Sequence, residues 1–136
     1  MIKKINHIGI IVPNVEEGIN LFRDGIGMEF LRMENLPDWK CKIAFFQCGE
    51  VMIELVEPTD ESDGMTFLKE RGGGIHHIAY EVDDINEEFS NAKKNFAVKT
   101  DSPVSGAGDS KVFFLDEKTI LNVVTEYVEV KNRRGL

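Results

Sequence analysis

Hydrophobic and polar positions follow the same order in two segments that lie 70 residues apart in the chain. Residues 7–12 and 77–82 alternate with a period of two, which predicts strands that bury one face. Each strand is followed by a turn and then by apolar residues at helical spacing, over about 15–25 and 85–95. The pattern therefore indicates an internal duplication.

Shorter alternating stretches follow each predicted helix. They predict strong strands at 42–46, 51–56, 111–115 and 121–128, and weaker ones near 28–33 and 97–100. Each half then reads β-α-β-β-β. The fold class predicted is α+β, with two tandem βαβββ modules forming a curved mixed sheet around a central cleft.

The predicted modules fit within a single domain, 1–136, of ordinary size. The first module would span about 1–60 and the second about 75–130. A predicted helix at about 64–71 would link them, ending at three glycines. Asn14 and Asp84 directly precede the two module helices, where N-capping residues are expected.

Composition and charge narrow the classes of function. The net charge of −8 argues against a nucleic-acid partner, which needs a basic surface. No apolar run approaches the roughly 20 residues that cross a bilayer, so no membrane partner is expected. The N-terminus lacks the pattern of a secretory signal. The two cysteines, Cys41 and Cys48, are best interpreted as reduced thiols of a cytoplasmic protein.

Alternation along the first strand of each half places His7 and His77 on the face opposite the helices. Each is followed two residues later by a small residue, Gly9 or Ala79, which leaves space on that face. The same alternation puts His76 on the other face, where a structural role is expected.

The last strand of each half carries one carboxylate between apolar neighbours. Glu54 follows His7 by 47 residues and Glu126 follows His77 by 49, so the two pairs are nearly equivalent under the repeat. A carboxylate in such a place is costly unless it is paired or metal-bound. Any one of these residues alone favours a structural interpretation, but the four together predict one divalent metal site, suited to Co, Ni, Zn, Mn or Fe.

The sequence resembles the vicinal-oxygen-chelate (glyoxalase/dioxygenase) superfamily, and within it most closely the methylmalonyl-CoA epimerases. The resemblance covers about 5–129 and is carried by NHIGIIVPNVEEGINLFRDGIGMEF, IELVEP, FLKERGGGIHHIAYEVDDI, SGAGDSKVFFL and VVTEY. It implies a glyoxalase-like fold with a central metal-binding cleft, and metal ligands at His7, Glu54, His77 and Glu126. It further implies an acyl-thioester substrate, either a CoA ester or a glutathione adduct, and a homodimer is plausible.

The resemblance implies an isomerase that removes a proton α to a thioester carbonyl, with Glu126 and Glu54 as the catalytic carboxylates. Relatives of this type carry a further acid near 40–43, where this chain has Lys40, Cys41, Lys42 and Ile43; Lys42 is a distant candidate for its replacement. A lactoylglutathione lyase of the glyoxalase I type is the alternative enzyme. A non-enzymatic small-molecule binding module is the second alternative. A ring-cleaving dioxygenase is less favoured, because its iron usually takes two histidines and one carboxylate.

Overall fold

The computed structural model describes residues 1–131 and divides the chain into two compact units. The first module is defined here as His7–His76. The second module is defined as Met1–Asn6 together with the chain from His77 onward. Residues 132–136 of the predicted domain lie outside the described residues, and the single domain over 1–136 stays a prediction.

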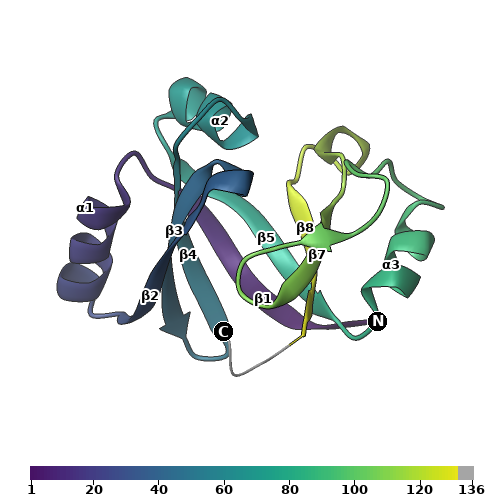
Figure 1. The fold of residues 1–136 in the computed structure, drawn as a ribbon, viewed down its shortest axis with the longest axis horizontal. Coiled ribbons are helices and arrows are strands. Elements are labelled where there is room, and N and C mark those ends of the chain that lie inside the picture. The colour runs from purple at the N-terminus through teal and green to yellow at the C-terminus, as the bar shows by residue number, and fades with distance from the viewer. Residues whose placement is uncertain (132–136) are drawn as a thin grey trace. The chain divides into compact units, whose positions relative to one another are not determined.

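The first module contains a mixed sheet in the order β2-β3-β4-β1 (Figure 1). Its strands are β1 (Ile2–Ile11), β2 (Glu29–Leu36), β3 (Cys41–Cys48) and β4 (Val51–Pro58). β1 pairs with β4 in parallel, whereas β3 pairs antiparallel with both β2 and β4. A parallel pair needs a crossover connection, and here the helices and two strands between β1 and β4 provide it.

The helix predicted at 15–25 has two parts. α1 (Val15–Ile19) is α-helical and continues as a π-helix, η1 (Asn20–Ile26), which ends at Gly27. Asn14 caps α1, accepting a hydrogen bond from the Glu17 backbone N–H at 2.9 Å. The core of this module joins the helix to β3 and β4 through Val15, Ile19, Ala44, Phe46 and Leu55.

The second module repeats this arrangement with β5 (Gly74–Val82), α3 (Ile85–Ala92), β6 (Val104–Ser105), β7 (Ser110–Phe114) and β8 (Thr125–Val130). The strand order is β5-β8-β7-β6, with β5 and β8 parallel and β7 antiparallel to β6 and β8. Its core joins α3 to β7 and to the residue that follows β7, through Ile85, Phe89, Ala92, Phe113 and Leu115. The predicted α+β class with two βαβββ modules is therefore confirmed.

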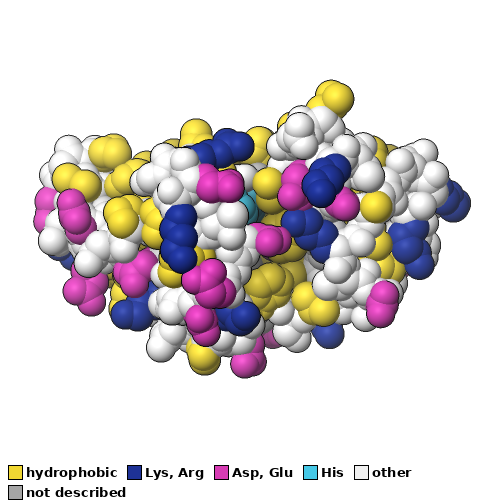
Figure 2. Space-filling model, turned by 90° about the horizontal axis from the view of Figure 1, so that it is seen from above, with side chains coloured by type: hydrophobic (Ala, Val, Ile, Leu, Met, Phe, Trp, Pro, Cys, Tyr) yellow, Lys and Arg dark blue, Asp and Glu magenta, His cyan; other side chains and the backbone are white. Residues whose placement is uncertain are grey.

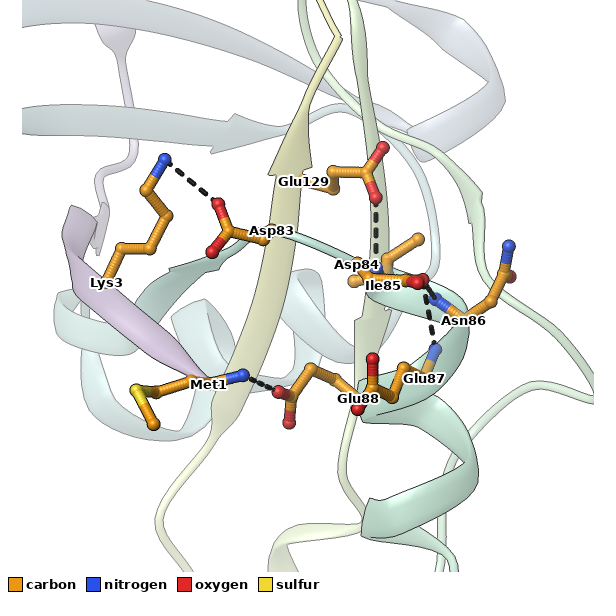
Figure 3. Close-up of polar contacts among 9 residues, drawn as sticks. All are labelled: Met1, Lys3, Asp83, Asp84, Ile85, Asn86, Glu87, Glu88 and Glu129. Atoms are coloured by element: carbon orange, nitrogen blue, oxygen red, sulfur yellow. Dashed lines mark hydrogen bonds and ion pairs between the residues drawn. The ribbon is translucent and has the colours of Figure 1, made fainter.

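Both module helices have the same second cap, a glutamate from the last strand of the module. Glu57 accepts a hydrogen bond from the Val15 N–H at 2.9 Å, and Glu129 accepts one from the Ile85 N–H at 3.0 Å. Figure 3 shows Glu129 reaching the start of α3, beside the N-cap Asp84. A carboxylate in this place satisfies a helical N–H that has no partner within the helix and interacts favourably with the helix dipole.

The first six residues of the chain contact the second module through polar side chains. Lys3 lies 3.2 Å from Asp83, and the N-terminal amine contacts Glu88 (Figure 3). Asn6 donates a hydrogen bond of 3.1 Å to Glu81, which is only 2% exposed. These contacts explain why β1 is divided between the modules just before His7.

Two predictions in the second half are wrong. The weak strand predicted near 97–100 is only an isolated bridge between Val98 and Leu115. The strand predicted to begin at residue 121 begins at Thr125, because Leu121 and Asn122 have φ values of 58° and 62°. Left-handed backbone cannot continue a strand, so the apolar run is interrupted there.

A helix is present at the predicted residues as α2 (Asp63–Arg71), which packs on β4. The glycines after it all have positive φ, 76° at Gly72, 111° at Gly73 and 125° at Gly74. A Cβ atom at Gly73 would lie 2.7 Å from the carbonyl oxygen of Ile11. Glycine is therefore required at residue 73 both by its conformation and by the close approach of β1. Among the helices of residues 1–131, none is long and apolar enough to cross a bilayer.

Candidate functional site

His7 and Glu54 meet on neighbouring strands of the first module. In the parallel pairing of β1 with β4, Gly9 lies opposite Glu54 and His7 opposite Met52. Nδ1 of His7 is 3.1 Å from Oε2 of Glu54, and each side chain is 6% exposed. Because Gly9 has no side chain, nothing projects from β1 directly beside the glutamate, and the imidazole can lie there. The predicted space beside the histidine is filled by a carboxylate.

The second module brings together His77 and Glu126 in the same way. In the pairing of β5 with β8, Ala79 lies opposite Glu126, as Gly9 does opposite Glu54. Nε2 of His77 is 3.2 Å from Oε1 of Glu126, and these side chains are 10% and 8% exposed. Each module therefore contains one predicted histidine and one predicted glutamate in contact and almost fully buried.

A phenylalanine lies beside each glutamate on the strand at its other side. Phe45 of β3 is opposite Glu54, and Phe114 of β7 is opposite Glu126. The ring of Phe114 also makes an edge contact with the His77 ring at a centroid distance of 5.7 Å. Sequence reasoning did not select these two residues, because an aromatic side chain in an apolar strand is usually part of the core. Their equivalent positions in the repeat are the signal that could have identified them.

The donor atoms within each pair fit the geometry of a metal centre. Two ligands at right angles on a cation, each bonded at about 2.1 Å, are separated by about 3.0 Å. The measured imidazole-to-carboxylate distances of 3.1 and 3.2 Å agree with this separation. The pairs also combine neutral nitrogen and anionic oxygen donors, which suit the transition metals predicted from the sequence. Each pair could therefore supply two adjacent ligands.

Lys42, the candidate replacement for the missing acid, does not lie on the face of the sheet that carries Glu54. Lys42 lies opposite Glu57, the helix-capping glutamate, so it is on the face away from Glu54. The suggestion that Lys42 replaces the missing acid is therefore wrong. Lys40 has left-handed backbone and its Nζ donates to the carbonyl of Glu61 at 3.1 Å.

Cys41 is on the face of Glu54 by alternation with Phe45, and it is buried. Burial, followed by the negative charge of Glu54, raises the pKa of the Cys41 thiol to about 11. The thiol therefore stays protonated at neutral pH. The first module thus has a neutral thiol on the glutamate-bearing face of β3, where a carboxylate was expected from the resemblance.

His76 occupies a structural position, as predicted. Its ring makes an edge contact with Phe67 of α2 at a centroid distance of 4.9 Å. This contact packs the middle of α2 against the start of β5. The adjacent histidines of the glycine-rich segment therefore have different roles.

Acidic side chains outnumber basic ones in this chain, 24 to 16. On the face drawn in Figure 2, the two kinds are interspersed and the basic ones do not gather into a continuous area. The basic side chains therefore interact mainly with the carboxylates and aromatic rings next to them. Arg32, which is paired with Glu34, is one such case.

The sequence profile of the glyoxalase/bleomycin resistance protein/dioxygenase superfamily matches residues 6–114. The chain belongs to this superfamily. The matched range includes His7, Glu54 and His77, and it ends at Phe114 before β8 with Glu126.

Curated relatives span almost the whole chain. One is the ethylmalonyl-CoA/methylmalonyl-CoA epimerase of Cereibacter sphaeroides, 31% identical over 134 residues, with coverage of 96% of this chain and 100% of that protein. Another is an uncharacterized protein of Bacillus subtilis (strain 168), 32% identical over 130 residues, with coverage of 94% and 93%. The superfamily relationship therefore includes both epimerases and proteins without a named activity.

The similar solved structures likewise include an epimerase and a protein without a named activity. The crystal structure of a hypothetical protein from Bacillus halodurans C-125 is 38% identical, covers 96% of both chains and has a TM-score of 0.90. A methylmalonyl-CoA epimerase in complex with methylmalonyl-CoA and NH4+ is 27% identical, also covers 96% of both chains and has a TM-score of 0.92. The glyoxalase-like fold is thereby shown.

Proposed function

We propose that His7, Glu54, His77 and Glu126 together hold one divalent cation, and that the protein is an isomerase of the methylmalonyl-CoA epimerase type. The observation that carries this proposal is the repeated buried contact between an imidazole and a glutamate, at 3.1 Å in one module and 3.2 Å in the other. Relatives named as epimerases, which match 96% of the chain, support it. The substrate would be an acyl-CoA thioester.

Glu126 is the proposed base for the proton on the carbon next to the thioester carbonyl. Its burial keeps water away from the carboxylate and strengthens its interaction with a bound substrate. Nε2 of His77 contacts Oε1 of Glu126 and so fixes the orientation of the carboxylate. The cation, when bound, would supply the positive charge that stabilises the enolate as the proton leaves.

Glu54 is the proposed carboxylate for the opposite face of the reacting carbon. Its contact with Nδ1 of His7 orients it as His77 orients Glu126. Return of the proton from this side would invert the configuration at that carbon. The role of Glu54 matters here because Lys42, on the adjacent strand, lies on the other face of the sheet.

The decisive experiment is solvent exchange with methylmalonyl-CoA in deuterium oxide. Protein freed of metal by a chelator is reconstituted separately with Co, Ni, Zn, Mn or Fe, and deuterium entry at the α-carbon is followed by NMR. Exchange that depends on stoichiometric metal is expected. Absence of exchange with every metal would refute the proposal.

The alternative functions give different results with the same preparation. A lactoylglutathione lyase would convert the hemithioacetal of methylglyoxal and glutathione and would not exchange the α-proton of methylmalonyl-CoA. A binding module would retain no stoichiometric metal and would take up none on addition. A homodimer and a cytoplasmic location stay predictions; light scattering of the purified protein tests the first, and fractionation of cells tests the second.

A further inference from the structure

Arg32 of β2 lies on the same face of the first-module sheet as Glu54. Arg32 is opposite Phe45 in the pairing of β2 with β3, and Phe45 is opposite Glu54 in the pairing of β3 with β4. Side chains of directly paired residues project from the same face of a sheet. The three residues therefore form a row across β2, β3 and β4.

The Arg32 side chain extends along this row towards β4. Its Cζ atom lies 4.1 Å from the centroid of the Phe45 ring, which is 0% exposed. The guanidinium is therefore above β3, only about one strand spacing, ~4.8 Å, from the strand that carries Glu54. An anionic group bound there would be beside the carboxylate proposed for the chemistry.

The ion pair between Arg32 and Glu34 leaves part of the guanidinium for another acceptor. Nε and Nη2 approach the same oxygen, Oε2 of Glu34, at 2.8 and 2.7 Å. The guanidinium is planar with five N–H donors, so an acceptor on the Nε edge leaves the end-on edge, Nη1 with Nη2, directed elsewhere. Within the described residues, the buried Nη2 has no aligned hydrogen-bond acceptor despite its closeness to Glu34.

The second module has a different cation beside its phenylalanine. The Lys99 N–H donates to the carbonyl of Phe114 at 3.0 Å, and Nζ of Lys99 lies 2.7 Å from Oε1 of Glu117. β6 pairs with β7 only through Val104 opposite Val112 and Ser105 opposite Lys111. No β6 residue is therefore paired with Phe114, the counterpart of Phe45. The two modules share the imidazole and carboxylate pair but differ at the strand beyond the phenylalanine.

From the row of Arg32, Phe45 and Glu54 we infer that Arg32 binds the free carboxylate of the substrate's acyl group through its end-on edge. The inference rests on the proposed function and adds a basis for substrate choice. Phe45 supports the guanidinium from below and Glu34 holds its other edge, so the arginine is held in place before the ligand arrives. A bidentate pair of arginine and carboxylate is both strong and directional. Thioesters that carry a second carboxylate on the acyl chain are therefore selected over neutral ones.

The test compares two ligands that differ only in that carboxylate, methylmalonyl-CoA and propionyl-CoA. Their binding to the metal-loaded protein is measured by calorimetry for the wild type and for Arg32→Met, Arg32→Lys and Glu34→Gln. Methionine preserves the unbranched side chain that covers Phe45 and removes only the charged donors. Thermal unfolding of each variant establishes that it is folded before binding is measured.

Wild-type protein is expected to bind methylmalonyl-CoA about 10- to 100-fold more tightly than propionyl-CoA, the range of one charge-assisted hydrogen-bond pair. Arg32→Met should reduce that ratio to near one by weakening methylmalonyl-CoA alone. Arg32→Lys should restore part of the ratio. Glu34→Gln should keep it, because the amide oxygen can still accept from Nε of Arg32. A ratio that is unchanged in Arg32→Met, or equal weakening of both ligands, overturns the inference.

Failure of the proposed function gives a different pattern. Binding is measured without turnover, so a wild-type protein that shows the ligand ratio but never exchanges the α-proton refutes the epimerase proposal and leaves the role of Arg32 supported. Normal exchange with no difference between the two ligands refutes the role of Arg32 alone.

Discussion

The two modules share their chemical groups and differ at their edges. In each, a strand histidine contacts the glutamate of the last strand, a small residue lies opposite that glutamate, and a phenylalanine flanks it. In each, the glutamate three residues further on caps the module helix. The outer strand is eight residues long in the first module and two residues long in the second.

The proposed cation and the proposed substrate place different requirements on the two modules. The proposed cation would take one imidazole and one carboxylate from each module, and the inner strands of the two modules are equivalent in these groups. A substrate without such symmetry would need different groups from the two modules, and the first module has Arg32 beside its phenylalanine where the second has Lys99. The variants below are ordered from the largest expected effect to the smallest, and each compares a residue of one module with its counterpart or its control.

Replacing the two site glutamates tests whether the modules are equivalent in chemistry. Glu126→Gln should slow α-proton exchange in methylmalonyl-CoA by about 100-fold or more at saturating metal, the usual contribution of a general base. Glu54→Gln should slow inversion of configuration, and both variants should bind metal more weakly. NMR exchange rates and metal titrations provide the measurements. Glu129→Gln, which alters the cap of α3 and the ion pair with Lys131 but no site residue, is the control with normal exchange. Full exchange in Glu126→Gln would remove Glu126 from the mechanism.

Replacing one glycine in each module compares how tightly the surrounding atoms pack against it. Gly73→Ala should lower the free energy of unfolding by about 3 kcal/mol, because the new Cβ meets backbone and the residue has positive φ. Gly106→Ala in the second module should cost about 1 kcal/mol, since its Cβ meets the side chains of Val112 and Ser110, which can move. Urea unfolding measures both. Equal losses would contradict the interpretation that the first-module glycine is held against backbone.

The capping glutamates should contribute equally to the two modules. Glu57→Gln and Glu129→Gln should each lower the free energy of unfolding by about 1 kcal/mol at pH 7. Glu16→Gln, which removes an exposed carboxylate in the first turn of α1, is the control and should have little effect.

The stability that the Glu129 cap contributes should also depend on pH. Its hydrogen bond with Lys131, followed by that with the Ile85 N–H, holds the pKa of the Glu129 carboxyl below its usual value. A carboxyl with a lowered pKa stabilises the fold above its unfolded-state pKa, and this contribution is lost as pH falls through the folded-state pKa. The difference between wild type and Glu129→Gln should therefore shrink below about pH 4. A difference that stays constant on acidification would contradict the charged cap.

Cysteine labelling tests the burial of Cys41 in the first module. At pH 8, with the Cys41 pKa raised to about 11, only about one in a thousand of these thiols is ionised. Iodoacetamide should therefore label one cysteine per chain rapidly, the exposed Cys48, and Cys41 only after denaturation. Mass spectrometry of native and unfolded samples measures this. Cys48→Ser should abolish the rapid reaction, and two rapid labels in the wild type would refute the burial of Cys41.

Some of this organisation is determined by local sequence. Alternation in a strand is a property of the backbone, so the faces of His7 and His77 follow from their neighbours alone. The caps Asn14 and Asp84 are likewise local, because a cap bonds to the N–H two or three residues ahead. The duplication itself is visible as a repeated pattern of residues.

Other features depend on which distant segments pair. The stretch 41–46 is apolar on both faces, so alternation alone does not show that Cys41 shares the face of Glu54 while Lys42 does not; the register with β4 decides it. Backbone conformation delays the start of β8 to Thr125, although the apolar sequence pattern already begins at Leu121.

The sequence by itself determined the repeated modules and the two histidines and two glutamates, because these follow from periodicity that short segments carry. Only the tertiary structure decided that each histidine contacts its glutamate, that phenylalanines flank both, and that Arg32 lies over one of them. These depend on strand register, which long-range hydrogen bonding and packing fix together.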